Sequence, residues 1–117
     1  MRRTVLIVDD HGDFRAAARE MLEAEGYAVI GEAADGAGAF QKVADLRPAI
    51  VLLDIQLPDT DGFAVAERLA SGPSPPIVVL ISSRDSSAYG DRLAHATVHG
   101  FISKVRLTGA SLAEIVG

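Results

Sequence analysis

The chain alternates short apolar runs of strand length with segments in which apolar residues recur at helical spacing. Most of the runs are continuous, which indicates strands buried on both faces. The runs are Thr4–Val8, Ala28–Gly31, Ile50–Leu53, Ile77–Ile81 and Gly100–Ser103. Five successive strand-helix pairs predict a parallel sheet with right-handed crossovers and helices on both faces. The expected fold class is therefore α/β, a doubly wound five-stranded parallel sheet.

The clearest helix lies between the first two runs, where apolar residues from Phe14 to Leu22 fall at i, i+3, i+4, i+7 and i+8. Asp13 is its expected N-cap, and Gly26 is the expected stop. Weaker periodicity predicts further helices at 37–46, 62–70, 86–96 and 108–116.

Composition narrows the class of protein. The 117 residues suit one domain, expected to span 1–117, and the 49% hydrophobic content excludes a disordered chain. The net charge of −5 comes without a basic stripe, so we expect no direct contact with nucleic acid. The chain has no cysteine, which removes disulfides, thiolate catalysis and zinc-thiolate sites.

Localisation follows from two further observations. The first apolar run ends at Asp9, too early for a signal peptide. No other stretch approaches the roughly eighteen apolar residues needed to span a bilayer. We therefore expect a cytoplasmic protein that does not contact a membrane.

Polar side chains gather at the ends of the expected strands. Asp9 and Asp10 follow the first strand, and Asp54 follows the third. Ser82 and Lys104 follow the fourth and fifth. Because the carboxyl ends of strands in such a sheet share one edge, where ligands bind, these side chains are expected to form one site.

The chemistry of these side chains indicates a metal and a phosphoryl group. Adjacent acids repel each other, and hard oxygen ligands with no histidine or cysteine beside them suit Mg²⁺, which would offset that repulsion. Lys104 would place a point charge on a phosphoryl group, and Ser82 would donate a hydrogen bond to it. Asp54 is the natural nucleophile, since a carboxylate can form an acyl phosphate.

The segments "VLIVDD", "LLDIQLPDTDGF", "VVLIS" and "GFISK" occur in the order typical of one family. Together with Asp9, Asp10, Asp54, Ser82 and Lys104, they make nearly the whole chain resemble the receiver domain of two-component response regulators. The resemblance implies a flavodoxin-like sheet with strand order 2-1-3-4-5. It also implies transfer of a phosphoryl group to Asp54 from a histidine kinase, a phosphotransfer partner or acetyl phosphate.

The resemblance implies finer roles as well. Asp10, Asp54 and the backbone carbonyl of Gln56 would hold Mg²⁺, with Asp9 acting partly through water. The side chains of Gln56 and Arg84 would flank the phosphoryl group and tune its lifetime. The protein would be a switch whose only chemistry is its own phosphorylation and dephosphorylation.

The output of the switch is also expected from the resemblance. Ser82 would move toward the phosphoryl oxygens, and Phe101 would swing inward and reshape the surface of the fourth helix, fifth strand and fifth helix. Phe101 lacks the hydroxyl of the tyrosine often found there, so the switch is expected to depend on packing alone. A downstream protein or an output domain outside this chain would read that surface, and a homodimer is compatible with the family.

Other interpretations stay open on sequence alone. Asp9 or Asp10 by itself would suit a helix cap, and Asp54 by itself a turn. His11 and the other histidines share no spacing, so they are expected to be solvated or capping residues. The alternatives to a phosphorylated switch are a receiver that signals without phosphate and a small phosphatase or phosphotransferase. Phosphate loading and turnover distinguish them.

Overall fold

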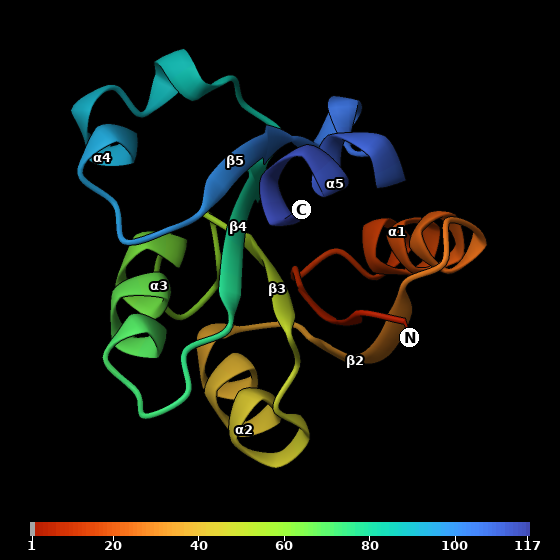
Figure 1. Ribbon diagram of the computed structural model, residues 1–117. Helices are drawn as coiled ribbons and strands as arrows, with labels where there is room; N and C mark the ends of the chain where they lie inside the picture. The colour runs from red at the N-terminus through yellow and green to blue at the C-terminus, as the bar shows by residue number, and fades with distance from the viewer. Residues whose placement is uncertain (1) are drawn as a thin grey trace.

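The computed structural model describes residues 2–117 and has a parallel five-stranded sheet at its centre (Figure 1). The strands lie in the order β2-β1-β3-β4-β5, and every neighbouring pair is parallel. The strands are β1 (Thr4–Val8), β2 (Ala28–Ala33), β3 (Ile50–Asp54), β4 (Ile77–Ser82) and β5 (Gly100–Ser103). The predicted fold class and the strand order are both confirmed.

Helices cover both faces of the sheet. One face carries α1 (Gly12–Ala24) and α5 (Gly109–Val116) (Figure 1). The other carries α2 (Gly36–Leu46), α3 (Gly62–Ala70) and the short α4 (Asp91–Ala94). Of two 3₁₀ turns, η1 (Ser86–Ala88) lies in the connection from β4 to β5, and η2 (Lys104–Arg106) directly follows β5. Within residues 2–117, no helix combines the length and the apolar character that crossing a bilayer would require.

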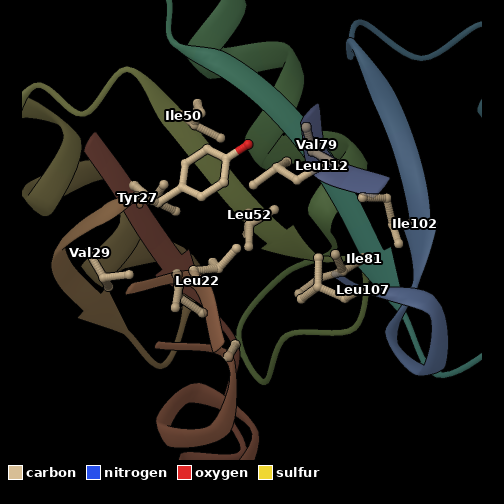
Figure 2. Close-up of a cluster of buried hydrophobic side chains, with 13 residues drawn as sticks. Leu22, Tyr27, Val29, Ile50, Leu52, Val79, Ile81, Ile102, Leu107 and Leu112 are labelled. Atoms are coloured by element: carbon tan, nitrogen blue, oxygen red, sulfur yellow. The ribbon is translucent and has the colours of Figure 1, made fainter. Parts of the chain in front are cut away.

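The central strands are continuous apolar runs because alternate side chains enter different layers of the core. Val5 and Ile7 face α1 and α5, whereas Leu6 and Val8 face α2 and α3. Figure 2 shows the first of these layers, in which Leu22 and Leu112 come from the two helices on that face. Fully burying an aliphatic side chain of this size contributes about 1.5–3 kcal/mol. Both layers together hold the strand ends in register.

The strands extend slightly further than their apolar content predicts. β3 includes Asp54 and β4 includes Ser82, so the polar residues expected just after these strands are their last residues. Asp54 pairs in register with Ile81 across the β3-β4 ladder. Ladder hydrogen bonding therefore holds the backbone of both residues at the carboxyl edge.

The predicted start of α1 is wrong by two residues. The helix begins at Gly12 with His11 as the N-cap, and Asp13 lies in its first turn. The reason lies in the preceding loop, where the Asp9 carboxylate accepts a hydrogen bond from the backbone N–H of His11 at 2.8 Å. This local bond turns the chain earlier than Asp13 could.

The predicted helix over 86–96 is largely wrong. Only η1 and the four residues of α4 are helical there. Gly90, between them, has φ +52°, in the region that favours glycine and interrupts a right-handed helix. Tyr89 and Leu93 both pack against the core, but Tyr89 lies at the end of η1 and Leu93 lies in α4.

Candidate functional site

A cluster of acidic side chains and one imidazole lies at the carboxyl edge of the sheet. Ligand atoms of Asp9, Asp10, His11 and Asp54 all lie within 4.8 Å of one another. Asp9 and Asp54 are buried, whereas Asp10 and His11 are exposed. The convergence follows from the topology, because β1 and β3 are neighbours in the sheet. The structure thus brings together the three acids that the sequence analysis placed here.

His11 also belongs to this cluster, so the expectation that no histidine lies beside the acids is wrong. Its Nδ1 lies 3.1 Å from Asp9 Oδ1 and 3.0 Å from Asp10 Oδ1. The sequence feature that could have placed His11 in the site is its position directly after two aspartates at a strand end. Because the partners of His11 are two aspartates, the spacing of the histidines relative to one another could not reveal its position in the site.

Lys104 is the cation of the site. Its Nζ lies 2.5 Å from Asp9 Oδ2 and 3.3 Å from Asp54 Oδ2. It also lies 4.6 Å from the centre of the Phe14 ring, which shields one side of the ammonium. Burial alone would lower the pKa of Lys104, but the Asp9 hydrogen bond and the two nearby negative charges outweigh burial and raise it. Lys104 is therefore charged at neutral pH.

Asp54 lies in a pocket that disfavours its charged form. Burial is the largest influence and raises the pKa of this carboxyl, and the negative charge of Asp9 adds to that effect. Lys104 and the backbone N–H of Gln56, which donates to Asp54 Oδ1 at 3.2 Å, oppose it. The net pKa is raised. A carboxylate disfavoured in this way gains from any further cation.

Gly62 makes room for the backbone beneath Asp54. Its N–H donates to the carbonyl of Ile55 at 2.7 Å. A Cβ at this position would lie 2.5 Å from the Asp54 carbonyl oxygen and 2.8 Å from Ile55 Cα. The close approach of α3 to the end of β3 therefore requires glycine here.

Ser82 occupies the end of β4, between β3, which ends at Asp54, and β5, which Lys104 directly follows. It is 1% exposed, and its Oγ accepts a hydrogen bond from the backbone N–H of Arg84 at 3.1 Å. The hydroxyl of Tyr89 lies 2.5 Å from the same oxygen. Tyr89 was expected only as an apolar residue of a helix, so this contact was not predicted.

The other predicted site residues lie around the cluster. Gln56 and Arg84 are exposed, and their contacts with Asp54 and Ser82 come from backbone N–H groups. Phe101 is half-buried in β5, and its ring centre lies 6.1 Å from that of Tyr89. The structure therefore places Gln56 and Arg84 beside the site and Phe101 in contact with the side chain that reaches Ser82.

The donor set fits a hard divalent cation. Three carboxylates supply oxygen ligands, and Mg²⁺ typically uses one or two carboxylates together with water. The buried Asp9 Oδ2 pairs with Lys104 Nζ at 2.5 Å. One ammonium beside three carboxyl groups leaves negative charge in the cluster, which suits a bound metal ion.

Residues 5–115 match the family model described as the response regulator receiver domain. The chain belongs to the response regulator receiver family. This receiver is also similar to the signal receiver domain of the response regulator NarL from Mycobacterium tuberculosis, at 31% identity and a TM-score of 0.86. That likeness covers 99% of this chain and 98% of the other.

Curated relatives of the receiver are longer proteins. The DNA-binding transcriptional activator EvgA of Escherichia coli K12 is 33% identical over 99 residues, covering 85% of this chain and 48% of EvgA. BvgA of Bordetella pertussis, named as a positive regulator of virulence-factor transcription, is 36% identical over 104 residues. That match covers 89% of this chain and 50% of BvgA. The chain thus spans about half the length of these relatives.

Proposed function

We propose that the receiver accepts a phosphoryl group on Asp54, with Mg²⁺ held by Asp9, Asp10, Asp54 and the backbone carbonyl of Gln56. The observation that carries the proposal is the position of Lys104 Nζ, which contacts both Asp9 and Asp54 at the end of β3. A half-buried lysine between two carboxylates leaves local negative charge for a metal, and it adds a cation that can bind a phosphoryl oxygen. Histidine kinases are the partners that membership of a two-component family implies.

The reaction would be an in-line displacement at phosphorus. An oxygen of Asp54 forms the new O–P bond while the P–N bond of a phosphohistidine, or the P–O bond of acetyl phosphate, breaks. The leaving imidazole or acetate departs with the bonding electron pair, and the product is an acyl phosphate on Asp54. When bound, Mg²⁺ supplies positive charge to the phosphoryl oxygens.

The residues of the chain supply positioning and charge. The ammonium of Lys104 would shift from Asp54 Oδ2 toward a phosphoryl oxygen, since the two positions are neighbours. The hydroxyl of Ser82 would donate a hydrogen bond to another phosphoryl oxygen. The side chains of Gln56 and Arg84, exposed at the rim, would control how water reaches the acyl phosphate.

The output surface is proposed to lie on α4, β5 and α5. Phe101 lies in β5 and contacts the segment between β4 and α4, so a change at Ser82 would reach that surface through neighbouring side chains. A downstream protein, or an output domain of the kind that would fill the remaining length of the relatives, would read it. A homodimer is a further assembly that this surface would allow.

The first experiment measures phosphorylation directly. The wild-type chain is incubated with Mg²⁺ and acetyl phosphate, and intact mass spectrometry is expected to show one added phosphoryl group. Asp54→Ala should abolish the added mass, whereas Asp45→Ala, which removes an exposed acid on α2, should not. Loading of Asp54→Ala at the wild-type level would overturn the proposal.

A second measurement tests the competing chemistries. Multiple turnover of a small phosphoester, instead of one stoichiometric event, would indicate a phosphatase or phosphotransferase. Absence of loading by acetyl phosphate and by a cognate kinase would indicate a receiver that signals without phosphate. Either result would replace the proposed switch.

A further inference from the structure

Tyr89 stands out in the segment between β4 and α4. Residues 83–88 and Gly90 are exposed, whereas Tyr89 is half-buried. Its hydroxyl lies 2.5 Å from Ser82 Oγ. Its ring packs near two others, with its centre 5.9 Å from that of Phe63 and 6.1 Å from that of Phe101. One side chain therefore joins the end of β4 to aromatic rings on α3 and β5.

The backbone around Tyr89 holds this position. Its N–H donates to the carbonyl of Ser86 at 3.1 Å, which closes η1. Gly90 follows with φ +52°, so the chain turns away directly after Tyr89. The edge-to-face arrangement with Phe63 is a favoured geometry for aromatic pairs. The ring thus has two aromatic neighbours while its hydroxyl contacts Ser82 at the end of β4.

The contact with Tyr89 limits the directions in which the Ser82 hydroxyl can donate its own hydrogen bond. A serine hydroxyl offers one proton and two acceptor lone pairs. The backbone N–H of Arg84 occupies one lone pair. If Tyr89 donates to the other, the Ser82 proton is left for a third partner. Ser82 follows Ile81, the register partner of Asp54, so that proton would serve an acceptor on Asp54.

We propose that Tyr89 is a positioning residue that orients the Ser82 hydroxyl toward the phosphoryl group and transmits its movement to Phe63 and Phe101. The inference rests on the proposed phosphorylation of Asp54. It replaces the expectation that the switch depends on packing alone. The hydroxyl that Phe101 lacks is supplied by Tyr89 from the preceding loop. Movement of Ser82 toward phosphate pulls or releases the Tyr89 hydroxyl, and the packed rings move with it.

The test removes one oxygen atom. Tyr89→Phe keeps the aromatic packing and deletes the hydroxyl, and Tyr27→Phe is the matched control. Tyr27 is the other of the two tyrosines and packs in the core layer that Figure 2 shows, whereas Tyr89 packs against the other layer. Loading of Asp54 by acetyl phosphate is expected to slow about three- to ten-fold in Tyr89→Phe, the range that one hydrogen bond supports. Tyr27→Phe should load at the wild-type rate, and Mg²⁺ affinity should stay within about two-fold in both variants.

A spectroscopic measurement separates positioning from a merely structural role. With ¹³Cζ-labelled tyrosine, the two resonances are assigned from the Tyr27→Phe variant, and the Cζ shift reports hydrogen bonding of the hydroxyl. Addition of Mg²⁺ and beryllofluoride should move the Tyr89 signal and leave that of Tyr27 in place. In Ser82→Ala, the Tyr89 signal should respond several-fold less.

The outcomes are distinct. Wild-type loading with a slowed Tyr89→Phe variant and a responsive Tyr89 signal supports the inference. Wild-type loading with a static Tyr89 signal, or with Tyr89→Phe loading at the wild-type rate, overturns the inference and leaves the proposed function standing. Failure of the wild type to load overturns both. The resonance is measured on the folded wild-type chain, so the test holds even if Tyr89→Phe folds poorly.

Discussion

Lys104 Nζ lies 3.3 Å from Asp54 Oδ2, although the two residues stand 50 positions apart in the chain. The contact exists because β3 and β5 both flank β4 and end at the same edge of the sheet. The same ammonium lies 2.5 Å from the buried Asp9 carboxylate. Lys104 thus offsets a repulsion that the fold creates by bringing the acids together.

Replacing Lys104 by alanine should destabilise the metal-free protein by about 2–4 kcal/mol. Without Lys104, the buried carboxylates of Asp9 and Asp54 face each other with no counter-charge. Because the Lys104 side chain is not fully buried, the expected destabilisation is somewhat smaller than the largest values for breaking a buried ion pair. Mg²⁺ should restore part of this stability while phosphate no longer changes the output surface. Urea unfolding with and without Mg²⁺ measures the effect. Arg106→Ala, in the same η2 turn but exposed, should change little, and equal losses in both variants would contradict the assigned role.

Mg²⁺ should raise the melting temperature of the wild type in a concentration-dependent way, because a ligand that binds only the folded state stabilises it by mass action. Asp10→Ala should remove most of that increase. Glu20→Ala, which deletes an exposed acid on α1 outside the cluster, should retain it. Thermal melts across a Mg²⁺ series, with a chelator as the zero point, give the comparison. A full Mg²⁺ response in Asp10→Ala would exclude Asp10 as a ligand.

The sheet and the acid cluster could be predicted because both follow from topology. Once continuous apolar runs indicate parallel strands, the residues at their carboxyl ends must share an edge, whatever their separation in sequence. The proximity of Asp54 and Lys104 could therefore be predicted without any knowledge of their side-chain directions. The apolar cores of the strands needed only the alternation between two layers.

The segment from β4 to β5 could not be predicted in the same way. Its helical spacing was real, but Gly90 separates Tyr89, at the end of η1, from Leu93 in α4. The bond between Tyr89 and Ser82 depends on that interruption and leaves no periodic signal. Asp59 is a similar case: it accepts hydrogen bonds from Gly36 and Ala37 and so caps α2 from a distant loop.

Gly62→Ala should destabilise the protein by about 1–3 kcal/mol and slow loading of Asp54. The added Cβ would lie 2.5 Å from the Asp54 carbonyl oxygen, and backbone atoms cannot yield as a flexible side chain can. Gly72→Ala is the control, since its Cβ would meet nothing closer than the Leu69 carbonyl oxygen at 3.4 Å. Urea denaturation and the acetyl phosphate assay measure both effects. Similar unfolding midpoints for the two variants would show that α3 shifts without cost.

Two arginines on α1, Arg15 and Arg19, bind Glu32 on β2. Glu32 accepts hydrogen bonds from Arg15 at 3.0 Å and from Arg19 at 2.8 Å. Burial alone would raise the pKa of Glu32, but the two arginines outweigh burial and lower it below the ordinary value of 4.5. Glu32→Gln should therefore lower the free energy of unfolding by about 1 kcal/mol at neutral pH, because the three side chains are only partly buried.

The stability that Glu32 contributes should depend on pH in the direction that its lowered pKa sets. A carboxyl whose pKa is lower in the folded state contributes its stability above the unfolded-state pKa, and loses it as pH falls through the folded-state pKa. The difference in unfolding free energy between wild type and Glu32→Gln should be constant near pH 7 and shrink below about pH 4.5. Glu23→Gln, whose carboxylate lies 3.9 Å from Arg19, should show a smaller difference. A wild-type advantage that grows on acidification would show that the arginines do not lower the pKa of Glu32.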